Sequence, residues 1–201
     1  MVISHRYRFI FVKTRKTAGT SIEVFLSGVC GAEDVFTPIM PPVPGHRSRN
    51  DGGFRNHMGV AALRDRVDPE VWDGYLSFCV ERNPWDKTLS HYHWCRARSN
   101  ADLTLDEYML HNRPCTDFHR YADPDTGRIR VDRVVRYESL HEDLAEVFGV
   151  CGVPFMGDLG IRAKGDVRTD RGHYRDRFSA AQRRWVEKAF AREIACFGYR
   201  F

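Results

Sequence analysis

The sequence predicts an α/β protein with three layers, in which a mostly parallel central sheet is covered by helices on both faces. Three apolar runs look like strands, at residues 7–12, 75–81 and 131–137, and a helical pattern follows each of them. Strands that alternate with helices favour a parallel sheet. A chain of 201 residues can bury a sizeable core, and it shows no internal repeat or linker, so we expect one domain over residues 1–201.

The first half of the chain reads as strand, loop and helix in turn. The strand at residues 7–12 ends at a short polar loop, and a helix over residues 20–26 follows. Residues 37–56 are rich in proline, glycine and arginine, and structureless loops of this length are usually functional or mobile. A helix over residues 58–66 then leads to the strand at residues 75–81.

The second half is mostly helical. Pro84 opens a helix over residues 84–98, since a proline loses no hydrogen bond in a first helical turn. Three capping boxes predict three further helix starts, at Thr104 with Glu107, Ser139 with Glu142, and Ser179 with Gln182. The last helix carries an apolar stripe made of Trp185, Val186, Ala189, Phe190, Ile194 and Phe197.

The loop after the first strand predicts an anion site. It consists of Lys16, Thr17, Ala18, Gly19, Thr20 and Ser21. The N–H groups at a helix start lack partners within the helix, and the helix dipole adds positive potential, so a phosphate or sulfate group fits there. Lys16 adds a mobile charge, and Thr17, Thr20 and Ser21 add hydroxyls. The loop is not a Walker A motif, because its lysine precedes its glycine. An ordinary strand–loop–helix joint with a surface lysine is the alternative.

A second phosphate element follows the second strand. Arg82 stands at the end of that strand, and Ser90 lies about two turns into the next helix. An arginine fork binds phosphate oxygens in pairs, so Arg82 and Ser90 are candidates to hold one phosphate together.

The two elements together resemble the PAPS-dependent sulfotransferases, where PAPS is 3′-phosphoadenosine 5′-phosphosulfate. The similarity is to the carbohydrate-type branch, sulfotransferase family 2, which has many bacterial members. Residues 11–21 look like the 5′-phosphosulfate loop of that family, and residues 80–90 look like its 3′-phosphate element. Residues 134–144 and 197–201 also match in order and spacing. Residues 13–15, Lys-Thr-Arg, depart from the usual His-Ile-Pro and add two positive charges near the anion.

The resemblance implies transfer of a sulfuryl group from PAPS to a hydroxyl of a carbohydrate, glycolipid or small-metabolite acceptor, without a metal. The product released is PAP, which is 3′-phosphoadenosine 5′-phosphate. It also implies that a basic segment near the C-terminus closes over the nucleotide, with Lys164, Arg168 and Tyr174 as candidates to touch it. A solvated run of charge is the plainer interpretation of that segment.

Two catalytic roles can be assigned on this hypothesis. Lys16 is the candidate to stabilise charge on the leaving oxygen, because sulfuryl transfer by analogy with phosphoryl transfer depends on positioning and electrostatics. A general base must also take the acceptor proton. His57 is the first candidate, where the resembled family often has a histidine; His46 is the second and Glu23 the third. A capping or surface role for His57, and a helix-dipole role for Glu23, are the alternatives.

Composition and charge narrow the class further. The net charge of +4 suits an anionic ligand without being a nucleic-acid footprint. Charged residues interrupt the apolar run that a signal peptide would need near the N-terminus, and no apolar run is long enough to span a membrane. We therefore expect a cytoplasmic, bacterial-type enzyme. The six cysteines are scattered, which argues against zinc and for buried thiols. A P-loop-like nucleotide kinase or hydrolase, which would need magnesium, and an RNA-binding module are the rival classes.

Overall fold

The computed structural model describes residues 1–99, 102–161 and 172–201. It divides into two compact units, each made of two segments of the chain. The sheet unit comprises Met1–Glu81 and His119–Ala163, and the helical unit comprises Arg82–Phe118 and Lys164–Phe201. Each unit has its own hydrophobic core and is described by itself. The expectation of a single domain stays a prediction.

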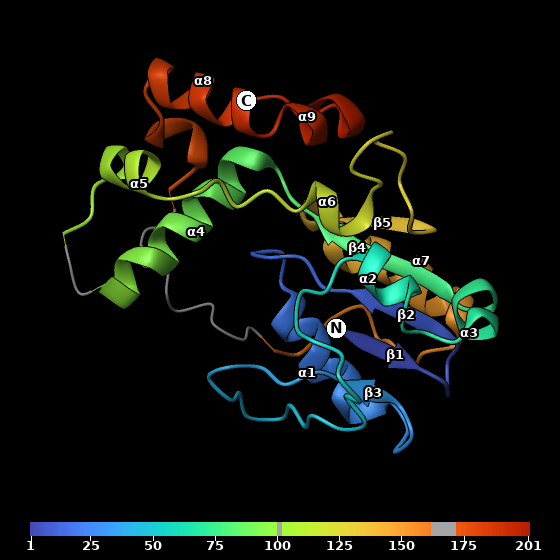
Figure 1. Ribbon diagram of the computed structural model, residues 1–201. Coiled ribbons are helices and arrows are strands. Elements are labelled where there is room, and N and C mark those ends of the chain that lie inside the picture. The colour runs from blue at the N-terminus through green and yellow to red at the C-terminus, as the bar shows by residue number, and fades with distance from the viewer. Residues whose placement is uncertain (100–101, 162–171) are drawn as a thin grey trace. The chain divides into compact units, whose positions relative to one another are not determined.

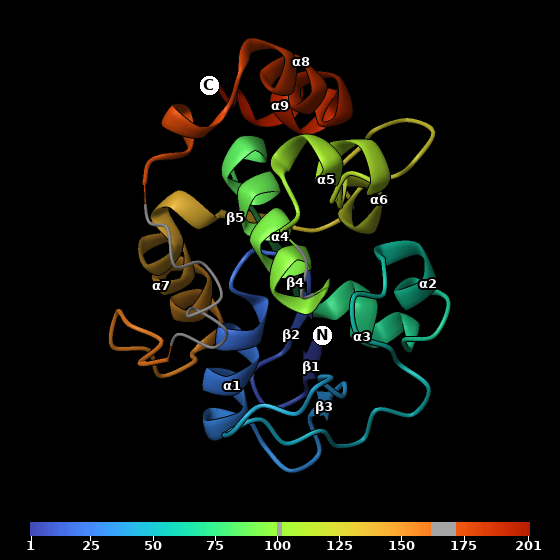
Figure 2. The same cartoon turned by 90° about the vertical axis from the view of Figure 1, so that its left-hand side faces the viewer.

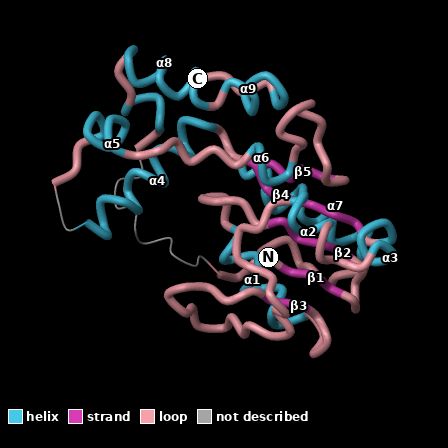
Figure 3. Tube along the Cα trace, viewed as in Figure 1, coloured by secondary structure: helices cyan, strands magenta, loops and turns pink. Residues whose placement is uncertain are grey.

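The sheet unit contains five strands in the described part of the chain: β1 (Val2–Ser4), β2 (Phe9–Val12), β3 (Val35–Phe36), β4 (Leu76–Glu81) and β5 (Arg133–Arg136). They are magenta in Figure 3 and lie in the order β3-β1-β2-β4-β5. The pairs β2–β4 and β4–β5 are parallel, whereas β1 pairs antiparallel with both β2 and β3. The sheet is therefore mixed, not mostly parallel. The physical reason is the four-residue turn between β1 and β2, which is too short for a parallel crossover.

Helices cover both faces of this sheet. Figure 2 shows α1 (Gly19–Val29) and α7 (Leu140–Cys151) on one side, with α2 (Val60–Arg64) and α3 (Pro69–Gly74) on the other. The α1/α7 side holds the main core, in which the rings of Phe11 and Phe78 stack with their centroids 5.0 Å apart. The short helix α6 (Phe118–Tyr121) spans the boundary between the units.

The helical unit is built around α4 (Pro84–Ser99), green in Figure 1. Its other elements are α5 (Leu105–His111), the 3₁₀ turn η3 (Tyr174–Arg177), α8 (Ala180–Ala189) and α9 (Ala191–Phe197). Its core includes Trp85, Tyr92, Tyr108, Val186 and Phe190. Lys87 and Asp117, both fully buried, form an ion pair of 3.1 Å within it.

Most of the predicted elements exist, with shifted ends. The capping boxes at Thr104 and Ser179 are confirmed. The box at Ser139 is wrong: that side chain makes no capping bond, because the 3₁₀ turn η1 (Tyr137–Ser139) leads into α7 instead. The last predicted helix is divided at Phe190 into α8 and α9. No helix in the described ranges is long and apolar enough to cross a membrane.

Candidate functional site

The loop between β2 and α1 has an unusual backbone. Lys16 and Ala18 both take left-handed conformations, with φ of 62° and 59°. Such conformations cost about 1–3 kcal/mol each in residues with a side chain, and they persist where the surrounding structure enforces them. Alternation of left- and right-handed residues turns successive N–H groups toward a common point, which suits an anion.

The N-terminus of α1 is left open by its own side chains. Ala18, at the N-cap, makes no side-chain capping bond, and the first turn contains no acidic residue. The backbone of Ile22 donates to the Ala18 carbonyl at 3.1 Å, so the N–H groups of Gly19, Thr20 and Ser21 precede the first helical hydrogen bond. N–H groups in this position, together with the helix dipole, suit an anion, and the anion site expected from the sequence stays a prediction.

Two threonines fix the loop from inside. The Thr14 hydroxyl donates to the Val80 carbonyl at 2.5 Å, which ties the end of β2 to β4. It also lies 2.8 Å from the Thr17 hydroxyl, and the Thr17 side chain is fully buried. The Thr17 hydroxyl thus holds the loop from inside, and the backbone N–H of Thr17 is the group that we expect to face a ligand.

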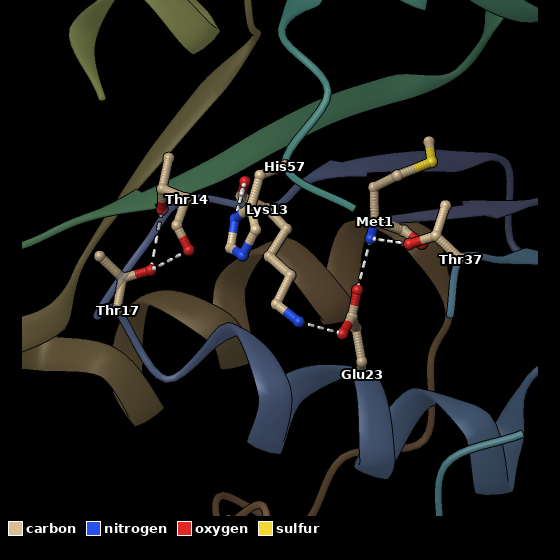
Figure 4. A network of polar contacts seen from close by, with 7 residues as sticks. All are labelled: Met1, Lys13, Thr14, Thr17, Glu23, Thr37 and His57. Carbon is tan, nitrogen blue, oxygen red and sulfur yellow. Dashed lines mark hydrogen bonds and ion pairs between the residues drawn. The ribbon is translucent and has the colours of Figure 1, made fainter. Parts of the chain in front are cut away.

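Beneath the loop lies a buried network of charges (Figure 4). Lys13 Nζ lies 2.5 Å from Glu23 Oε2, and the α-amino group of Met1 pairs with Glu23 Oε1. The amino group also donates to the Thr37 hydroxyl at 2.7 Å. Burial alone would raise the pKa of Glu23, but the Met1 amino group and the Lys13 ammonium outweigh it and lower that pKa.

This network changes two expectations. Glu23 Oε2 pairs with Lys13 and Oε1 with the Met1 amino group, whose own pKa burial lowers to about 6. The pKa of Glu23 is lowered as well, which argues against Glu23 as a general base. The ammonium of Lys13 is neutralised by Glu23, so Lys13 does not add to the positive charge offered to an anion. The Lys13 stem also explains Gly19, since a Cβ there would lie 2.8 Å from Lys13 Cγ.

His57 is held by contacts to its ring and to its backbone. Its Nδ1 lies 3.1 Å from the Lys13 carbonyl oxygen, as Figure 4 shows. A carbonyl only accepts, so Nδ1 carries the proton and Nε2 is the basic nitrogen of the neutral ring. The backbone of His57 is left-handed, with φ of 60°, and Arg120 Nη1 donates to its carbonyl oxygen. A strained, oriented histidine beside the anion loop fits a functional role.

His46 occupies a more apolar place. Its ring packs edge-on against Phe36, with the centroids 6.1 Å apart. Its Nε2 is buried and has no hydrogen-bond partner within the part of the chain that the structure describes. Burial, the largest cause, lowers the pKa of His46. The ring is therefore neutral near pH 7, but nothing orients its basic nitrogen.

The second phosphate element lies in the helical unit. Arg82 Nε and Nη2 donate to Asp86 Oδ2 at 2.9 and 2.6 Å. Ser90 follows Asp86 by one turn, on the same face of α4. Asn83 accepts from the backbone of Trp85 at 3.1 Å. Asp86 thus takes the edge of the Arg82 guanidinium that carries Nε and Nη2.

One of the three C-terminal candidates can be placed. The Tyr174 hydroxyl accepts from Asn83 Nδ2 at 3.3 Å, which puts Tyr174 next to Arg82 within the helical unit. Lys164 and Arg168 lie outside the described residues.

Sequence reasoning missed several residues that shape these elements. Asp86 had a readable signal, because it follows Arg82 by four residues and opposite charges at that spacing pair on a helix. Thr14 and Lys13 stand just beyond a strand and gave no such signal. Arg120 reaches His57 from 63 residues away, which only the fold reveals. Among the described residues, no group of three or more His, Cys, Asp or Glu could hold a metal.

These features define an α/β protein with a strand–loop–helix segment that suits an anion and an oriented histidine next to it. No protein-family model matches the chain. It is 37% identical over 108 residues to a curated protein of Archaeoglobus fulgidus that is named only "Uncharacterized protein". The match covers 52% of this chain and 90% of that protein, and the chain belongs to the same family.

A comparison of folds finds one further similarity. The chain is similar to the crystal structure of a sulfotransferase from Alicyclobacillus acidocaldarius, with 18% sequence identity and a TM-score of 0.47 over 96% of each chain. A likeness this weak does not by itself establish a shared fold or activity.

Proposed function

We propose that this protein is a PAPS-dependent sulfotransferase that transfers a sulfuryl group to a hydroxyl of a carbohydrate, glycolipid or small-metabolite acceptor. The observation that carries the proposal is the start of α1, where two left-handed residues precede a helix without a side-chain cap or a first-turn acid. The resemblance of residues 11–21 and 80–90 to the two phosphate elements of that family supports it.

The loop supplies the electrostatic part of the proposed site. The backbone N–H groups of residues 17–21 would hold the 5′-phosphosulfate, and PAPS would supply an activated sulfuryl group on a phosphate leaving group. Lys16, partly exposed at the left-handed turn, would stabilise the charge that develops on the leaving oxygen. Because Lys13 pairs with Glu23, we assign this task to Lys16.

The proton is assigned to His57. The Lys13 carbonyl fixes Nδ1 as the protonated nitrogen, so Nε2 is the nitrogen that would take the proton of the acceptor hydroxyl. His57 therefore stays our first candidate for the base and His46 the second. Arg82 would read the 3′-phosphate, with Ser90 and Tyr174 as its partners in the helical unit and Lys164 and Arg168 as further candidates.

The first test measures the binding of PAP by calorimetry, with and without magnesium. We expect PAP to bind without a metal and more tightly than ATP. Binding that requires magnesium, or that favours ATP, would support the rival nucleotide kinase or hydrolase.

A second test separates a ligand role for α1 from a purely structural one. Thr20→Glu places a carboxylate in the first turn, which stabilises a helix by about 0.3–1 kcal/mol. The same charge repels a bound anion, so the affinity for PAP should fall about tenfold or more. Thr20→Gln is the neutral control: it removes the same hydroxyl without adding a charge, so the further loss in Thr20→Glu measures the effect of the charge. Unchanged PAP affinity in Thr20→Glu would place the anion elsewhere.

A further inference from the structure

The six cysteines of the chain are not alike. None forms a disulfide. Cys79 and Cys115 are buried, and Cys196 is exposed. The other three are partly buried: Cys30, Cys95 and Cys151. The expectation of buried thiols therefore holds only in part. Burial raises the pKa of Cys30 to about 12 and also raises that of Cys151, so neither thiol ionises readily.

Cys95 has a histidine beside it. His91 lies one turn earlier on α4, and its Nε2 is 3.9 Å from the Cys95 sulfur. Its Nδ1 is 2.7 Å from the hydroxyl of Tyr108, which α5 contributes. The ring also stacks on Trp94, with the centroids 5.7 Å apart and the planes 15° from parallel. Both nitrogens and one face of the imidazole are thus fixed by neighbours.

This arrangement can hold a proton in either of two places. A phenol hydroxyl donates to a bare Nδ1 and accepts from a protonated one, so Tyr108 suits both charge states of His91. A nucleophile, a base in contact with it and a third group that orients the base form the usual signature of an activated nucleophile. The thiol proton of Cys95 can accordingly pass to His91 Nε2.

The charges around Cys95 on α4 are mostly positive. Arg98 lies with its guanidinium 4.9 Å from the ring centroid of Trp94, and Arg96 pairs with Asp102 at 3.4 Å on the surface. His93 shares the same helix. The C-terminal end of the α4 dipole disfavours a thiolate, and these cations oppose it.

The acidic residues of α5 are held by other partners. Asp106 accepts from Gln182 of α8 at 2.7 Å, and Glu107 accepts from the Thr104 hydroxyl and backbone, each at 2.8 Å. Neither carboxylate is therefore committed to His91, and the hydroxyl of Tyr108 is the contact that α5 makes with its ring nitrogen.

We propose that Cys95 is a nucleophilic thiol, activated by His91 and Tyr108, and a site of reversible modification by small disulfides. The Cys95 sulfur attacks one sulfur of the disulfide, the S–S bond of the reagent breaks, and a mixed disulfide forms. The departing thiolate takes up the proton that His91 Nε2 received from Cys95. This site is independent of the sulfotransferase proposal, since it uses none of the residues of the anion loop.

The experiment measures the reactivity of each cysteine in the native full-length protein. The protein is treated briefly with iodoacetamide, or with the aromatic disulfide of thionitrobenzoate, between pH 5 and 9, and the labelled peptides are quantified by mass spectrometry. At pH 7 we expect Cys95 to react about five- to tenfold faster than the more exposed Cys196, because a larger fraction of Cys95 is thiolate. For the same reason, the midpoint of its rate-versus-pH curve should lie at a lower pH than that of Cys196. Equal rates and equal pH midpoints for the two cysteines would overturn the proposal.

Variants assign the effect to the cluster. His91→Gln should reduce the Cys95 rate to that of Cys196, and Tyr108→Phe should reduce it partly. His93→Gln is the matched control on the same helix and should leave the rate unchanged. If His91→Gln lowers nothing while its circular dichroism is native, the proposal fails. If that variant does not fold, the comparison of Cys95 with Cys196 in the wild-type protein still decides.

Discussion

At the residue scale, the site depends on backbone groups as much as on side chains. His57 illustrates this, because a main-chain carbonyl of Lys13 selects its protonated nitrogen and a side chain of Arg120 bonds to its own carbonyl. The sequence indicated a histidine in this place, but it did not show that φ is positive there. Left-handed geometry in a residue other than glycine is set by tertiary contacts, which a local pattern does not encode.

The tautomer of His57 gives a prediction that needs no acceptor. In ¹⁵N NMR spectra of the neutral ring we expect Nδ1 to be protonated and Nε2 to be bare. With the best acceptor found in a screen, the wild-type rate should fall below a pH of about 6–7, as His57 takes up a proton. His57→Gln should lower kcat about 100-fold or more and remove that acid limb.

His46→Gln is the matched control for this experiment. If instead His46→Gln removes the acid limb and His57→Gln keeps near-wild-type turnover, the base is His46.

Arg82 gives a second prediction at this scale. PAP and AMP differ only by the 3′-phosphate, so Arg82→Ala should weaken PAP binding by about 1.5–3 kcal/mol and AMP binding much less. Arg96→Ala, which removes an arginine of α4 from an exposed ion pair, should change neither affinity. Equal losses for the two nucleotides in a calorimetric titration would show that Arg82 does not read the 3′-phosphate.

At the scale of elements, the sequence predicted types better than ends. The strands at β2 and β4 and the helices α1, α4 and α5 are where apolar period, proline and capping residues indicated them. The antiparallel β1 and β3 escaped prediction, because segments of three and two residues are too short to show a period. The single capping box that failed, at Ser139, gave way to the 3₁₀ turn η1, which precedes α7.

The start of α1 can be tested through its glycine. Gly19→Ala puts a methyl group 2.8 Å from Lys13 Cγ, so we expect a loss of about 1–3 kcal/mol in the free energy of unfolding. Gly28→Ala is the control in the same helix, where a methyl group meets nothing within 4 Å. There the better helix propensity of alanine should raise stability by up to about 1 kcal/mol. Urea titrations followed by circular dichroism measure both, and a neutral Gly19→Ala would contradict the packing of Lys13 described above.

At the scale of the whole molecule, the question is whether two cores unfold as one. Phe148 lies in the core of the sheet unit, which also contains Trp72, whereas Trp85, Trp94 and Trp185 lie in the helical unit. In a Trp72→Phe background, tryptophan fluorescence therefore reports on the helical unit alone. Phe148→Ala should cost about 3–5 kcal/mol. If residues 1–201 form one cooperative domain, as the sequence predicts, the urea midpoints from far-UV circular dichroism and from tryptophan fluorescence should fall together.

A fluorescence midpoint that stays at the wild-type value while circular dichroism shifts would show two independently folding parts. Phe190→Ala, in the core of the helical unit, is the matched variant and tests the converse. The sequence could not decide this point, because both units are assembled from segments far apart in the chain.

Two neighbouring strands of the sheet, β4 and β5, are far apart in the sequence, and this has a consequence for biosynthesis. β4 ends at Glu81, but its neighbour β5 begins at Arg133 and the helix that covers their shared face ends at Cys151. Ribosomes add about 5–20 residues per second, so the newly made β4 waits several seconds for both. Throughout that interval one edge of β4 is unpaired and the apolar side chains of Phe78 and Val80 lack their cover. The nascent chain therefore passes through a stage that favours aggregation and calls for chaperone protection, although the finished protein buries both residues completely.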